Sequence, residues 1–112
     1  MISYTHYSEM WDAAIKSDSL ETFTALWSGR HLADTFILNA VYDMAHGGVR
    51  RIRAIIGLSQ ARFSERYEIP RRSLEDWETG KHLPTSYAIK MLGFSILADI
   101  VDEDVLLENA AD

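Results

Sequence analysis

Apolar side chains recur at helical spacing along most of the chain, and no stretch alternates cleanly between apolar and polar positions. Near the N-terminus, Met10, Trp11, Ala14 and Ile15 share one helical face, and Ser8 before them is a suitable N-cap. Hairpin dipeptides such as Asn-Gly and Asp-Gly are absent from the sequence. The pattern therefore predicts an all-α protein.

Two further amphipathic helices are expected before the middle of the chain. Asp18 and Glu21 have the spacing of a capping box, which opens a short helix that ends at Gly29. A third helix is expected over about residues 32–45, ended by the glycine pair 47–48. The predicted inward positions of the two helices are Leu20, Phe23, Trp27, Leu32, Phe36, Ile37, Ala40, Val41 and Met44.

The second half of the chain contains shorter helices and one long one. A helix from Val49 to Gly57 carries arginines 50, 51 and 53 on the face opposite its isoleucines, either as a solvated face or as phosphate contacts. The last long helix, Tyr87 to about Val101, is capped by Thr85 or Ser86. It is apolar nearly all round, so it must be covered on several sides. The acidic residues 102–104 predict a turn before a final short helix, which gives six or seven helices in total.

Charge is unevenly distributed along the sequence. The chain has a formal net charge of −6. Residues 50–90 contain nine Lys/Arg and five Asp/Glu, a balance of +4, whereas the rest contains two basic and twelve acidic residues. Exposed charges are largely screened beyond about 8–10 Å, so the local field decides what the basic middle attracts. An acidic total is therefore compatible with a nucleic-acid-binding segment.

The basic middle also contains two short helices separated by a break. Ser59 is suited to cap the first, and Pro70 stands at or just before the first turn of the second, where its missing N–H costs nothing. Pro70 also forces the residue before it into an extended conformation, which separates the helices. The second helix begins with Arg71 and Arg72 and stops at Gly80. The predicted inward residues of the two helices are Phe63, Tyr67, Ile69, Leu74 and Trp77.

This segment resembles the Cro/repressor (XRE-type) helix-turn-helix family, in a variant that reads Ile-Pro-x-Arg-[Ser/Thr]-Leu-x-x-Trp-Glu-x-Gly. The matching residues are Leu58, Ser59, Gln60, Phe63, Ile69, Pro70, Arg72, Ser73, Leu74, Trp77, Glu78, Gly80 and Pro84. The resemblance covers about 40 residues when the preceding helix is included. It implies a lambda-repressor-like helix-turn-helix core over residues 49–112. The extra N-terminal helices over residues 1–48 lie outside the resemblance, and we expect them to provide packing, a dimer contact or a partner surface.

The resemblance also implies roles for single residues. Arg71, Arg72 and Asp76 fall where the family reads base edges in the major groove of double-stranded DNA. Contacts to the phosphate backbone fall to Ser59, Gln60, Arg62, Ser73 and Lys81, of which Gln60 also braces the second helix and Arg62 is suited to either role.

The sequence departs from the family pattern at three places that affect the turn, the packing of the first helix and the expected DNA-reading surface. Glu68 stands where the turn usually has glycine, and a left-handed conformation costs such a residue about 1 kcal/mol. Ser64 replaces the usual alanine and needs a hydrogen-bond partner. Glu75 and Asp76 put two carboxylates on or beside the reading surface, where they accept from cytosine amino groups or else repel the duplex.

The sequence therefore predicts a transcriptional regulator, a repressor or antitoxin-like protein, which binds double-stranded DNA as a homodimer. The alternative is a protein-interaction module that keeps the helix-turn-helix fold as a scaffold and binds a toxin or other partner through residues 1–48. No cysteine, close histidine pair, nucleophile with a base, or phosphate-binding glycine loop is present, so we expect no metal site, no cofactor and no enzyme. Without a membrane-spanning run or a signal-like N-terminus, a cytoplasmic location is expected.

Overall fold

The computed structural model describes the backbone of residues 2–27 and 34–111, and the side chains of these residues as far as Val101. Within these residues the chain is all-helical, as predicted, with six helices and no strand. Their bounds are α1 (Tyr4–Lys16), α2 (Leu20–Trp27), α3 (Thr35–Ile56), α4 (Gln60–Arg66), α5 (Arg71–Thr79) and α6 (Ser86–Ala111).

The first two helices are capped by residues other than those the sequence suggested. Ser3 caps α1 by accepting a hydrogen bond at 3.2 Å from the N–H three residues on, so Ser8 lies inside the helix. Ser19, rather than Asp18, accepts the corresponding bond of α2 at 3.1 Å. Both predicted caps were wrong because any Ser or Asp oxygen can serve this purpose, and packing of the helix selects among them. The predicted helix end at Gly29 lies outside the described residues.

A kink divides α3 into two helical segments. Gly48 has φ 71° and ψ −165°, a combination that is almost restricted to glycine, and the backbone is helical on both sides of it. The predicted break at the glycine pair is therefore confirmed, as a sharp change of direction rather than a loop. Asp34 caps the start of α3, and the left-handed Gly57 ends it as predicted; Leu32 lies outside the described residues.

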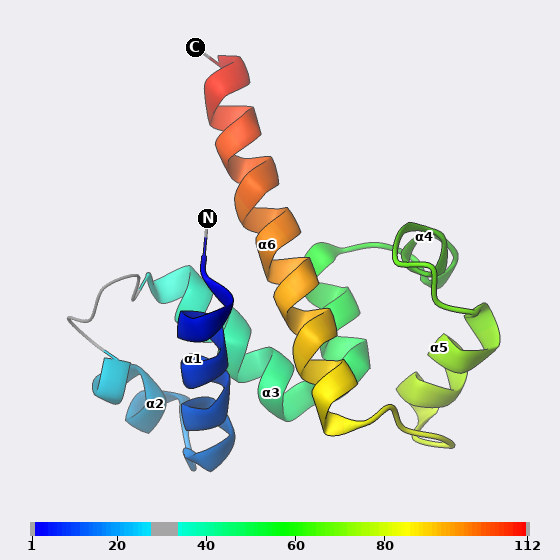
Figure 1. Ribbon diagram of the computed structural model, residues 1–112, viewed down its shortest axis with the longest axis horizontal. Coiled ribbons are helices and arrows are strands. Elements are labelled where there is room, and N and C mark those ends of the chain that lie inside the picture. Colours follow the sequence, from blue (N-terminus) through cyan, green and yellow to red (C-terminus); the bar gives the residue numbers. More distant parts are fainter. Residues whose placement is uncertain (1, 28–33, 112) are drawn as a thin grey trace.

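Figure 1 shows α1 and α2 on one side of the molecule and α4 and α5 on the other, with α3 and α6 crossing between them. One hydrophobic cluster contains residues of both predicted parts of the chain, for example Trp11 and Ile96, and so runs across residue 48. The Tyr7 hydroxyl donates to the backbone carbonyl of Lys90 at 2.7 Å, which fastens α1 to α6. Helices α1 and α3 thus cover α6, as its nearly all-round apolar sequence requires.

Most of the predicted inward residues are buried or partly buried, and three are not. Ile15 is 51% exposed, Leu20 38% and Phe36 50%. In α3 the core takes Leu38, which is 4% exposed, in place of Phe36. Residues two positions apart on a helix are rotated by about 200° around its axis, so Phe36 and Leu38 cannot both face the core. The periodic pattern does not tell which of the two does.

The long final helix differs from the prediction at its end. Thr85 caps it, since its hydroxyl accepts from the N–H of Ala88 at 3.1 Å. The turn predicted at residues 102–104 is wrong, because α6 continues to Ala111, and its C-terminal part projects beyond the rest of the molecule (Figure 1). Asp and Glu are tolerated inside helices, and neither Gly nor Pro interrupts this stretch.

Candidate nucleic-acid interface

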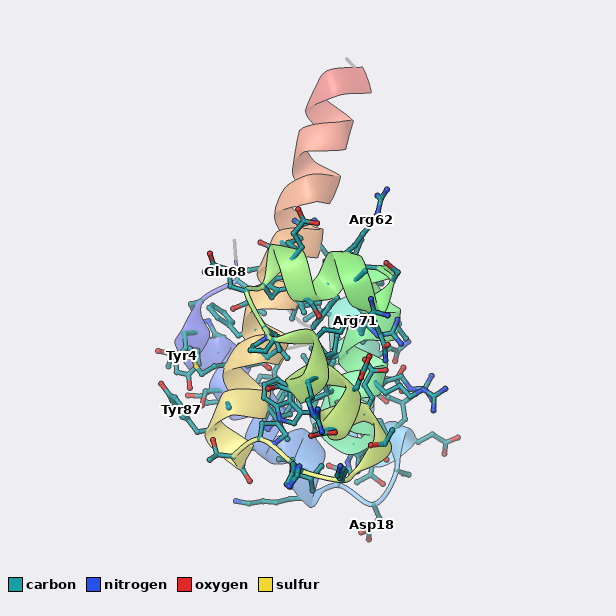
Figure 2. All side chains as sticks on the ribbon, turned by 90° about the vertical axis from the view of Figure 1, so that its right-hand side faces the viewer. Tyr4, Asp18, Arg62, Glu68, Arg71 and Tyr87 are labelled. Atoms are coloured by element: carbon teal, nitrogen blue, oxygen red, sulfur yellow. The ribbon has the colours of Figure 1, made fainter. Side chains whose placement is uncertain are left out.

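Helices α4 and α5, with the residues that flank them, form a compact unit at one edge of the molecule (residues 59–81, hereafter the α4–α5 unit; Figures 1 and 2). The Ser59 hydroxyl caps α4, accepting from the Arg62 N–H at 3.2 Å. Pro70 precedes α5 with φ −54°, and the left-handed Gly80 ends that helix. The expected boundaries of both helices are therefore confirmed.

An apolar wedge joins the two helices. Phe63 of α4 and Leu74 of α5 are fully buried, and Tyr67, Ile69 and Trp77 pack partly buried against the core, as predicted. The α4–α5 unit is also bonded to α6, since the hydroxyl of Tyr67 donates to a carboxylate oxygen of that helix at 2.7 Å.

The turn between the helices carries the strain that its sequence indicates. Glu68 has φ 54°, and it is the one residue other than glycine with positive φ in the described part of the chain. This conformation costs about 1 kcal/mol relative to glycine. The Ser64 hydroxyl oxygen is buried and has no hydrogen-bond partner among the described residues, so its need for a partner is not met.

An ion pair fixes α5 to the helix before the α4–α5 unit. The Arg53 guanidinium donates from Nε to one carboxylate oxygen of Glu78 at 2.6 Å and from Nη2 to the other at 2.9 Å. Its Nη1 donates to the carbonyl of Leu58 at 2.9 Å, and Gln60 Nε2 donates to Glu78 at 3.3 Å. The carboxylate side chain is only 6% exposed and the guanidinium 22%. We call these three side chains and the Leu58 carbonyl the α3–α5 clamp.

The hydrogen bonds of the clamp shift the pKa values of its ion pair in opposite directions. Hydrogen bonds from Arg53 lower the pKa of Glu78 below its ordinary value, and the reciprocal bonds raise the pKa of Arg53. Sequence reasoning placed Arg53 on a solvated or phosphate-binding face, and this was wrong, because the side chain reaches α5 across 25 residues. The glutamate of the Trp-Glu-x-Gly pattern was the available signal, but its partner was not evident from spacing.

The three predicted base-reading residues lie on α5 in different surroundings. Arg71 is exposed, with Nε 3.5 Å from a carboxylate oxygen of Glu75 one turn later. Arg72 is exposed and makes no ion pair within the described part of the chain. Asp76 is only 21% exposed in its side chain, and its Oδ2 lies 3.1 Å from Nδ1 of His82. Both carboxylates that the sequence placed on or beside the reading surface thus have a partner of their own.

The predicted phosphate contacts lie mostly on the outside of the same unit. Arg62 and Lys81 are exposed, as is Ser59 at its capping position, and Ser73 is half-buried. Figure 2 shows Arg62 on α4 and Arg71 on α5, and places Glu68 away from both. Gln60 is engaged by Glu78, in keeping with the bracing role expected of it.

The described residues contain neither a metal-binding cluster nor a membrane-spanning helix. No group of three or more His, Asp or Glu side chains among them is arranged to hold a metal ion. None of the helices in the described ranges has the length and apolar character needed to cross a bilayer. Comparison with known protein families, curated proteins and solved structures finds no match to this chain.

Proposed function

We propose that this chain is a sequence-specific double-stranded DNA-binding transcriptional regulator, a repressor or antitoxin-like protein of the cytoplasm, that reads the major groove with α5. The observation that carries the proposal is the N-terminal end of α5, where Arg71, labelled in Figure 2, and Arg72 are both exposed. An α-helix fits the major groove, which is about 12 Å wide, and a helix-turn-helix presents its second helix there by its N-terminal residues.

The anchoring of α5 supports this proposal. A reading helix discriminates between bases only if its side chains are held in register with the duplex. The α3–α5 clamp ties the C-terminal end of α5 to α3 through Glu78, and Leu74 packs α5 on α4. Among the described residues, no side-chain hydrogen bond or ion pair ties the first turn of α5 to another helix, and this turn carries the two exposed arginines.

The two arginines differ in what binding would require. Arg72 has no acidic partner among the described residues, so it is the first candidate for a bidentate contact with guanine, worth about 1–3 kcal/mol of discrimination. Arg71 would have to leave Glu75, at 3.5 Å, before it contacts DNA. Replacing Glu75 by glutamine is therefore expected to strengthen binding.

Selection of duplexes from a random library, followed by binding titrations on the selected sequence, tests the proposal. Arg72→Ala and Arg71→Ala should weaken binding about 10–100-fold and relax the preference at one base pair each. Lys16→Gln, which removes one exposed cation from α1, is the matched control and should leave the preference unchanged. The proposal fails if the wild-type protein binds no duplex at low salt, or if neither arginine variant changes the selected sequence.

The proposal includes a homodimer. Two half-sites on one face of DNA lie about 34 Å apart, so a dimer would present two copies of α5 at that separation. Light scattering with and without the selected duplex measures the stoichiometry, and a palindromic selected sequence is the expected companion result. A single protomer per duplex on a non-repeating site would remove the dimer from the proposal.

A protein-interaction role through residues 1–48 is the second candidate, and one feature favours it. Helices α1 and α2 border a hollow of about 510 Å³ whose lining includes Glu9, Asp18 and Leu26. Leu26 is 55% exposed, and Ile15 on α1 is 51% exposed. Absence of duplex binding together with a protein that co-purifies stoichiometrically, and is lost on Leu26→Lys, would select this role.

A further inference from the structure

Two arginines next to the α4–α5 unit have no role in the proposed reading of the major groove. Arg50 and Arg51 lie on the second segment of α3, are exposed, and form no ion pair or side-chain hydrogen bond within the described residues. Together with Gly47 and Ala54 they line a hollow of about 370 Å³. Arg50, Arg51 and Ala54 share one side of the helical segment after the kink, and Gly47 borders the hollow from the residue before the kink. The hollow is therefore a positively charged concavity without a counter-charge bonded to it.

Gly47 gives the hollow its shape. A Cβ atom at this position would lie 2.5 Å from Cβ and 2.8 Å from Cγ of Arg51, so only glycine leaves room for that side chain to lie back along the helix. The opposite face of the same segment is anchored, because Val49 and Ile52 are buried in the core. The two guanidinium groups thus extend from a fixed segment of helix.

The clamp relates this hollow to α5. Arg53 joins the same segment of α3 to Glu78, near the C-terminal end of α5. Arg50 lies one turn before Arg53 on the same helical segment, and so on the side of α3 from which Arg53 reaches Glu78. Exposed arginines therefore flank α5 at both ends, with Arg71 and Arg72 at its start and Arg50 beside its end.

We propose that Arg50 and Arg51 bind backbone phosphates of the DNA strand that borders the C-terminal end of α5, while α5 lies in the major groove. The inference rests on the proposed DNA-binding function and adds a second anchoring point to it. Helix α5 has nine residues and is about 13 Å long, close to the groove width of about 12 Å. Arg50, beside the C-terminal end of the helix, can therefore reach a phosphate wall of the groove while Arg71 and Arg72 at the other end contact base edges. Guanidinium groups suit this role, since their forked donors match phosphate oxygens.

Salt dependence separates this role from base reading. Binding of Arg50→Gln, Arg51→Gln and the control Lys16→Gln is titrated from 50 to 200 mM salt, on the duplex selected by the wild-type protein and on a scrambled duplex of equal length. Each arginine variant should lower the slope of log K against log salt by about 0.9 and weaken both duplexes by the same factor. Arg50→Lys and Arg51→Lys keep the positive charge and should therefore keep the wild-type slope. If a substitution at these positions acted by unfolding the protein, the lysine variants would not retain this slope.

The outcomes distinguish this inference from the function on which it rests. If the wild-type protein binds neither duplex at 50 mM salt, the proposed function and the inference both fall. If it binds and both glutamine variants keep the wild-type slope, the function stands and the phosphate contacts are overturned. A change in the selected sequence, without a change in slope, would instead make these residues base readers and would also overturn the inference.

Discussion

Removing the carboxylate of the α3–α5 clamp should strongly destabilise the fold. Glu78→Gln keeps the shape of the side chain but replaces an ionised acceptor of three hydrogen bonds by an amide whose NH₂ faces a guanidinium. Hydrogen bonds to charged groups contribute about 1.5–3 kcal/mol each and are not additive, and removing one partner of a buried pair costs about 3–5 kcal/mol. Because the side chain of Arg53 is 22% exposed, water can solvate it in part. We therefore expect a loss at the low end of that range, about 3 kcal/mol.

The assay is urea and thermal unfolding at pH 7 and at a series of lower pH values. A loss of about 3 kcal/mol corresponds to a fall in Tm of roughly 10 °C or more for a chain of this size. The pKa of Glu78 is lowered in the folded state, so its contribution to stability is complete above the unfolded pKa of about 4.3. It is lost as the pH falls through the folded value. The difference between wild type and variant should therefore shrink on acidification below pH 4.

Two controls make the result specific. Glu65→Gln removes an exposed carboxylate of α4 that forms no bond in the described part of the chain, and should change stability by less than about 0.5 kcal/mol. Arg53→Met completes a double-mutant cycle, in which the two losses should be far from additive. A Glu78→Gln protein within about 1 kcal/mol of wild type at pH 7, or a difference that does not change with pH, would refute the reasoning.

Three further substitutions test single features of the fold by urea denaturation. Ser64→Ala removes a buried hydroxyl without a partner and should stabilise the chain by about 1 kcal/mol; a loss of stability would mean that the hydroxyl is satisfied in solution. Gly48→Ala should cost about 1–3 kcal/mol, because φ 71° and ψ −165° disfavour any side chain even where space is open, and a neutral result would contradict the kink. Gly93→Ala puts a Cβ 2.6 Å from the Tyr7 hydroxyl and 3.1 Å from Trp11, so about 1–3 kcal/mol should be lost; unchanged stability would show that α1 can move away from α6.

Several features of this protein follow from local sequence because their causes are local. Ser59 caps a helix, Pro70 precedes one, and Gly57 and Gly80 end helices in left-handed conformations, all as the residues indicated. In each case the backbone conformation depends on the residue itself and on its neighbours within one turn. The left-handed conformation of Glu68 does not belong to this group, because the residue itself disfavours it and the resemblance to the family's turn, not the local sequence, indicated it.

Other features were decided only when the helices packed. The sequence pattern placed Phe36 of α3 in the core, and this was wrong: Leu38 is buried there instead, because the position of α3 against its neighbours decides which apolar residue faces inward. The continuation of α6 through the acidic residues 102–104 likewise depends on the whole helix and not on these three residues alone.

The proposed reading surface combines both kinds of determinant. Its two arginines at the start of α5 were evident from the sequence, since helix boundaries and exposed positions can be derived from local pattern. The clamp between Arg53 and Glu78, and the nearby Arg50, required the tertiary structure. An ion pair between residues 25 positions apart forms only when the fold brings the charged atoms of the two side chains to within 3 Å, and no periodicity encodes that distance.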